Sequence, residues 1–86
     1  GILRHDVVAM ESGIIKGIDN LKIASIARLA GAPMDKGAGV YIHKKIGDTV
    51  SQGMVLLSIY AEFNADFNFA IALAEKESSF TLESHE

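Results

Sequence analysis

Residues 54–61, Met-Val-Leu-Leu-Ser-Ile-Tyr-Ala, form the most apolar run in the chain, and this run constrains the fold more than any other feature. The run is short and ends in an Ile-Tyr-Ala sequence, which is typical of a buried strand. The whole chain has 86 residues, enough for one domain at most. Because 49% of them are hydrophobic, we expect residues 1–86 to fold as a single domain around this strand.

Four other segments have the composition of strands: residues 5–11, 14–18, 40–44 and 80–82. Two helices are predicted between them. The first spans residues 20–30, with Asp19 or Asn20 as its N-cap and Gly31 as its stop. Its apolar face consists of Ile23, Ile26, Ala27 and Ala30. The second helix is expected to begin at Asp66 as its cap, and its apolar face consists of Phe67, Ala70, Ile71 and Ala74. The predicted order, β-β-α-β-β-α-β, is that of a small α+β domain.

A Gly-Asp-x-Val-x-x-Gly turn, residues 47–53, precedes the apolar run. Gly47 and Gly53 permit a positive φ at two corners, and Asp48 can bond the backbone of its own turn. Val50 and Leu56 can then point inward together. This arrangement is the hairpin of α/β-hammerhead and barrel-sandwich domains, so we predict that fold here.

Lipoyl and biotinyl carrier domains use the same turn, but their modified lysine follows it. Here Lys36 precedes Gly47-Asp48, and the lysine after the apolar run, Lys76, falls on a helical pattern. We therefore expect Lys36 to be unmodified and the chain to bind no cofactor. A lipoyl/biotinyl-like carrier domain remains an alternative.

The charges and composition argue against several partners. Eleven Asp and Glu against eight Lys and Arg give a formal net charge of −3, and no basic stripe favours nucleic acid. No apolar run approaches about 18 residues, so we expect no membrane partner. No signal peptide is evident at the start, and we expect a cytoplasmic protein. The chain lacks Cys, so thiolate metal sites are excluded.

His5, His43 and His85 lie on separate segments without metal-ligand spacing, so no metal site is predicted. His43 is expected on the outward side of its strand, as a solvated or interface residue. Phe69 falls outside the apolar face of the second helix, and an exposed Phe69 would indicate a docking surface.

No catalytic residue is assigned. Glu62 and Asp66 could be imagined as a carboxylate pair, but they are placed at a strand end and a helix cap, where each has a local structural role.

Residues 30–48, AGAPMDKGAGVYIHKKIGD, strongly resemble the C-terminal domain of the thymidine and pyrimidine nucleoside phosphorylases. The resemblance continues through Val50, Gly53, Leu57 and residues 59–62. It extends back to Ser12-Gly13 and residues 18–20, and forward onto the second helix, so that it covers residues 10–76. The branch it resembles most closely is the archaeal one that includes AMP phosphorylase.

The resemblance implies that the chain is the C-terminal α/β-hammerhead domain of a longer, homo-oligomeric enzyme. A small helical domain and a phosphate-binding α/β domain would precede it. Such enzymes are pentosyltransferases that use phosphate as co-substrate and release a base and a sugar 1-phosphate. Their phosphate-binding and base-binding residues belong to the preceding domains, so the resemblance assigns no substrate-binding residue here. It also does not choose between AMP, thymidine and uridine.

Asp35, Lys36, Gly37 and Gly39 lie in a glycine-rich loop that could cradle a phosphate through its backbone N–H groups. The loop leads into a strand, whereas phosphate loops usually open a helix, so a turn is the favoured role. In the two-lobed architecture that the resemblance implies, we expect this loop to face the cleft and Lys36 to add positive potential there. We also expect the loop to be poorly held by its own domain. A free-standing interaction module remains a second alternative for the chain.

Overall fold

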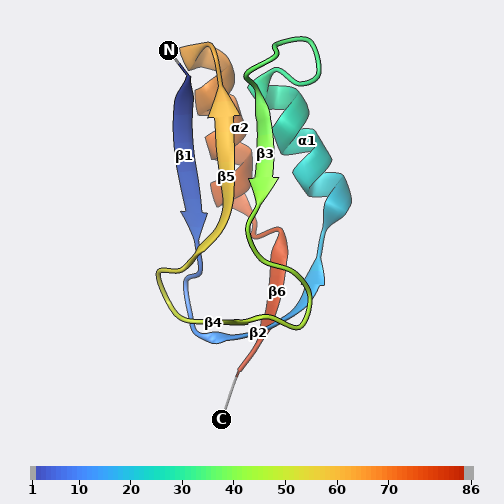
Figure 1. The fold of residues 1–86 in the computed structure, drawn as a ribbon, viewed down its shortest axis with the longest axis vertical. Coiled ribbons are helices and arrows are strands. Elements are labelled where there is room, and N and C mark those ends of the chain that lie inside the picture. Colours follow the sequence, from blue (N-terminus) through green and yellow to red (C-terminus); the bar gives the residue numbers. More distant parts are fainter. Residues whose placement is uncertain (1, 85–86) are drawn as a thin grey trace.

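A computed structural model of the chain describes residues 2–84 and measures 42 × 21 × 20 Å. Two three-stranded antiparallel sheets follow one another along the long axis, and both helices lie behind the first sheet (Figure 1). In chain order the elements are β1 (Leu3–Val8), β2 (Gly13–Ile18), α1 (Asn20–Ala30), β3 (Gly39–Ile42), β4 (Thr49–Val50), β5 (Val55–Ala61), α2 (Asn64–Lys76) and β6 (Phe80–Glu83). The predicted α+β class is confirmed.

The apolar run forms β5, the central strand of the first sheet, whose strand order is β1-β5-β3. Because side chains alternate along a strand, β5 presents Leu57, Ile59 and Ala61 to one face and Ser58 and Tyr60 to the other. We call the first the inner face, since the helices pack on it, and the second the outer face. The three inner-face side chains are fully buried or nearly so, which confirms the predicted buried strand.

Helix α1 begins and ends as predicted. Asp19 is its N-cap and accepts a hydrogen bond from the Lys22 backbone N–H at 3.0 Å. Gly31 ends it with a φ of 123°, a conformation that favours glycine. The helix buries Ile23, Ile26 and Ala30 against the sheet. The described helices have 11 and 13 residues, and neither is long and apolar enough to cross a membrane.

The second sheet has the strand order β4-β2-β6 and contains the predicted turn. Gly47 and Gly53 have φ values of 97° and 90°, and the Asp48 carboxylate accepts from the Lys45 backbone N–H at 2.9 Å. Val50 and Leu56 are both buried, so the hairpin geometry predicted from the sequence is confirmed. The turn also contains the short strand β4, which the prediction did not include.

Two predicted element starts are wrong. The first strand spans Leu3–Val8 rather than residues 5–11, because its extent follows from pairing with β5, where Leu3 lies opposite Ala61. Helix α2 begins at Asn64 with Phe63 as its N-cap, and no side chain caps it. Asp66 instead lies in the first turn, where a carboxylate interacts favourably with the positive end of the helix dipole.

Gly47→Ala is expected to lower the free energy of unfolding by about 1–2 kcal/mol, because a residue with a Cβ is strained at this positive φ. Atoms around the new methyl group would not add to this cost, since no atom of residues 2–84 lies within 4 Å of its position. Gly17→Ala is the matched control: its φ is not positive, and the nearest atoms to an added Cβ are 3.6 Å away. Equal losses for the two variants in urea denaturation would contradict the turn geometry.

Candidate functional site

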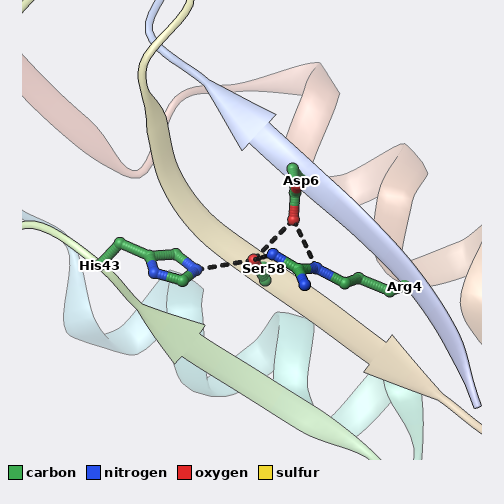
Figure 2. Close-up of polar contacts among 4 residues, drawn as sticks. All are labelled: Arg4, Asp6, His43 and Ser58. Carbon is green, nitrogen blue, oxygen red and sulfur yellow. Dashed lines mark hydrogen bonds and ion pairs between the residues drawn. The ribbon is translucent and has the colours of Figure 1, made fainter.

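Four polar side chains from three strands meet on the outer face of the first sheet (Figure 2). We call this group, Arg4, Asp6, His43 and Ser58, the polar cluster. Arg4 and Asp6 come from β1, Ser58 from the centre of β5, and His43 directly follows β3. Asp6 lies opposite Ser58 in the β1–β5 register. The cluster therefore joins all three strands of the sheet.

Ser58 is the hub of the polar cluster and is fully buried, with an exposed fraction of 0%. Its Oγ lies 2.7 Å from Asp6 Oδ1 and 2.8 Å from His43 Nε2. Arg4 donates from Nε to Asp6 Oδ1 at 2.9 Å and from Nη2 to Ser58 Oγ at 3.5 Å. A serine hydroxyl has one hydrogen and two lone pairs, so these three contacts use the full capacity of Ser58.

The contacts determine where the protons lie. An ionised carboxylate only accepts hydrogen bonds, so the Ser58 hydroxyl donates to Asp6. Ser58 Oγ then accepts from the other side, and His43 must carry a proton on Nε2 to donate to it. The cluster thus requires a proton on His43 Nε2 and leaves Nδ1 outside the network.

The pKa of Asp6 is held below its ordinary value, mainly by the hydrogen bond from Ser58 and then by that from Arg4. The pKa of Arg4 is raised by its hydrogen bond to Asp6 and by the charge of that carboxylate. Both shifts favour the ionised forms, so the Arg4–Asp6 pair stays charged over the physiological range.

The polar cluster contains the residue types of a Ser-His-Asp triad in the wrong arrangement. In a triad the histidine lies between the other two and accepts the serine proton. Here Ser58 lies in the middle, donates its hydrogen bond to Asp6 rather than to His43, and is fully buried. The geometry supports a structural cross-link between strands rather than a nucleophile.

Two tyrosines flank the polar cluster on the same face. The Arg4 guanidinium carbon lies 5.7 Å from the centre of the Tyr60 ring, within the range of a cation–π contact. The Tyr41 and His43 rings have centroids 4.8 Å apart and are tilted by 49°. The outer face therefore presents aromatic rings together with ordered polar groups.

The predicted loop residues Asp35, Lys36, Gly37 and Gly39 lie between α1 and β3, at the opposite end of the molecule from the second sheet (Figure 1). The Gly37 backbone N–H donates to the Glu62 carboxylate at 2.7 Å. Within the loop, the Asp35 N–H donates to the Gly31 carbonyl at 2.9 Å. Glu62, which directly follows β5, therefore anchors the centre of this loop to its own domain.

The Glu62 carboxylate also argues against the alternative that this loop binds a phosphate through its backbone N–H groups. It already accepts from the Gly37 N–H, and its negative charge would repel a phosphate at this position. Residues 31–37 are in turn and bend conformation. Lys36 is exposed and follows a helix rather than occupying the tip of a β-hairpin, which also argues against the carrier alternative.

The histidines considered as metal ligands do not share a site in the described residues. His5 bonds Glu75 of α2 at 3.0 Å, whereas His43 belongs to the polar cluster, and His85 lies outside the described residues. Within residues 2–84 no three His, Cys, Asp or Glu side chains gather as metal ligands could.

Phe69 is 65% exposed, as its helical phase predicted.

Sequence reasoning did not select Arg4, Asp6 or Ser58. A signal was present at Ser58, which interrupts the apolar run with a polar side chain, whereas Arg4, His5 and Asp6 are three consecutive polar residues without an apolar alternation. The signal could not identify partners, since residues 6 and 58 meet only through the strand pairing.

Comparisons with known proteins give one consistent family. The family model described as "Pyrimidine nucleoside phosphorylase C-terminal domain" matches residues 14–81. The "Putative thymidine phosphorylase" of Rhodopseudomonas palustris (strain BisA53) is 46% identical over 83 residues, 96% of this chain and 16% of that relative. The "AMP phosphorylase" of Methanosarcina barkeri is 46% identical over 78 residues, 91% of this chain and 15% of that relative. The equal identities do not single out the archaeal branch.

Ser58→Ala is expected to lower the free energy of unfolding by about 1–2 kcal/mol, because it removes a buried hydroxyl that bonds a charged carboxylate. Ser79→Ala is the control, since Ser79 is also buried, at 7% exposed, and its hydroxyl takes part in none of the side-chain hydrogen bonds within residues 2–84. Chemical denaturation of both variants would test this. A Ser58 variant as stable as the Ser79 variant would show that the polar cluster does not contribute to stability.

The lowered pKa of Asp6 makes the contribution of the polar cluster depend on pH. Ionised Asp6 stabilises the fold above the ordinary carboxyl value of 3.8, and this contribution is lost as pH falls through the lower folded-state pKa. The difference in unfolding free energy between wild type and Asp6→Asn should therefore be constant near neutral pH and shrink in acid below 3.8. A difference that persists unchanged into strong acid would contradict the assignment.

Proposed function

Because the chain belongs to the family of pyrimidine nucleoside phosphorylase C-terminal domains, we propose that it acts as the C-terminal domain of a longer enzyme that performs phosphorolysis. The observation that carries this proposal is the family match over residues 14–81, which includes both helices and the strands β3, β4 and β5. The chain spans only 16% of the length of the R. palustris relative. The remaining length would supply the substrate site.

The reaction that we propose for the full-length protein is the transfer of a pentosyl group from AMP or a pyrimidine nucleoside to phosphate. The products are the free base and a sugar 1-phosphate. The names of the relatives, thymidine phosphorylase and AMP phosphorylase, support this class of substrate. Phosphate would be the co-substrate and no organic cofactor would be needed. We further propose a cytoplasmic homo-oligomer.

The role that we propose for residues 32–39 is to line the cleft where substrate binds. Glu62 anchors the loop at Gly37, while the tip of the loop projects, with Met34 87% exposed. Lys36 is exposed beside this tip and forms no ion pair with another residue in the described range 2–84. When the two lobes close, its charge would add positive potential near a phosphate-bearing ligand.

The proposed function predicts a division of activity between the domain and the full-length protein. Residues 1–86 alone should release no base from AMP, thymidine or uridine in the presence of phosphate, because the chain offers no assembled set of anion donors and base contacts. The full-length protein should release base from at least one of them. Release by the domain above a blank, or no release by the full-length protein with any of the three, would overturn the proposal.

Lys36→Ala in the full-length enzyme should raise the KM for phosphate or lower kcat by about fivefold, the effect of about 1 kcal/mol of screened charge attraction. Lys16→Ala removes the same charge from β2 and serves as the control. Steady-state kinetics and melting temperature should be measured for both. Equal kinetics for the two variants would show that Lys36 is only a surface residue.

A further inference from the structure

We propose that the outer face of the first sheet is the surface on which this domain packs against the rest of the full-length polypeptide. The residues of this outer face are Arg4, Asp6, Tyr41, His43, Ser58 and Tyr60. The inference rests on the proposed function only in requiring a longer chain. It adds an orientation for the domain, which neither the family match nor the proposed loop role provides.

The two faces of the sheet differ in what covers them. Helices α1 and α2 pack on the inner face, where Leu57, Ile59 and Ala61 are buried. Figure 1 shows both helices on the same side of the sheet, and no described element lies over the other side. Tyr41 on the outer face is accordingly 61% exposed. A large aromatic side chain on an open sheet face is a candidate for contact with another surface.

The outer face carries hydrogen-bonding groups that a partner surface could bind. Within the polar cluster, Ser58 has used its one hydrogen and both lone pairs. Other groups on this face can still form hydrogen bonds with a partner. They are the other guanidinium N–H groups of Arg4, the Nδ1 of His43, and the hydroxyls of Tyr41 and Tyr60. Neither hydroxyl bonds another residue within the range 2–84. A surface that meets this face therefore needs hydrogen-bond acceptors near Arg4 and apolar atoms over the tyrosine rings.

The side chains are also held in place before any contact forms. Arg4 is oriented by Asp6 and by the Tyr60 ring, and His43 by Ser58 and the Tyr41 ring. Ordering such side chains normally costs free energy when an interface forms, because their rotamer freedom is lost. The polar cluster removes part of that cost. Tyrosine and arginine are moreover the residue types enriched at interface centres.

The occupant that we infer is the rest of the same polypeptide rather than a second copy. The chain covers 16% of the R. palustris relative, so a segment several times larger than this domain is tethered to it in that protein. Tethering gives a high effective concentration, so even a modest polar face can be occupied without a separate binding event. The rival surface is the exposed side of α2, where Phe69 is the exposed large hydrophobic side chain of the helix.

The test is hydroxyl-radical footprinting of the native full-length protein, with oxidation read by mass spectrometry at Tyr41 and Phe69. These two aromatic side chains form a matched pair, because they are 61% and 65% exposed in the domain and belong to different elements, β3 and α2. Each rate is divided by the rate at the same residue in the unfolded protein, which corrects for intrinsic reactivity. We expect the normalised rate of Tyr41 to be at least several-fold below that of Phe69.

Three outcomes overturn the proposal: equal rates at both residues, a lower rate at Phe69 alone, or protection of Tyr41 that disappears when the protein is diluted until its oligomer dissociates. The last would assign the face to a second copy. Protection of Tyr41 that survives dilution supports the proposal. The same preparation is assayed for phosphorolysis, so that loss of the proposed function and loss of the proposed interface are read separately.

Discussion

The burial of β5 is the constraint on which the rest of the structure depends. This strand is hydrogen-bonded on both sides, to β1 and β3, while its inner face is covered by α1 and α2. Leu57, Ile59 and Ala61 supply the apolar surface that the helices cover, and burial of such side chains contributes about 1.5–3 kcal/mol for each Leu or Ile. The glycine-cornered turn before β5 then determines how the second sheet joins this core.

The same strand organises both regions that we connect with function. On its outer face, Ser58 gathers Arg4, Asp6 and His43 into the polar cluster. Just beyond its end, Glu62 binds the backbone of Gly37 and anchors the loop that carries Lys36. Both are arranged as surfaces, which agrees with a domain whose relatives contain several times more chain.

Local patterns in the sequence predicted much of the fold. The cap and stop of α1, at Asp19 and Gly31, were recognisable because each is a short-range interaction within one turn of the chain. The hairpin corners at Gly47 and Gly53 were recognisable for the same reason, since only glycine adopts a positive φ without strain. The family resemblance also came from sequence, and it assigned no catalytic residue to this chain.

By itself, the sequence determined the buried strand, the first helix and the turns, because hydrophobic periodicity and backbone preference act over a few residues. Only the tertiary structure decided where β1 begins and that α2 starts at Asn64, with Phe63 as its N-cap. It alone also decided that Asp6 bonds Ser58 and that Glu62 bonds Gly37. The physical reason is that these contacts join residues 52 and 25 positions apart, which come together only when β1 and β3 pair with β5.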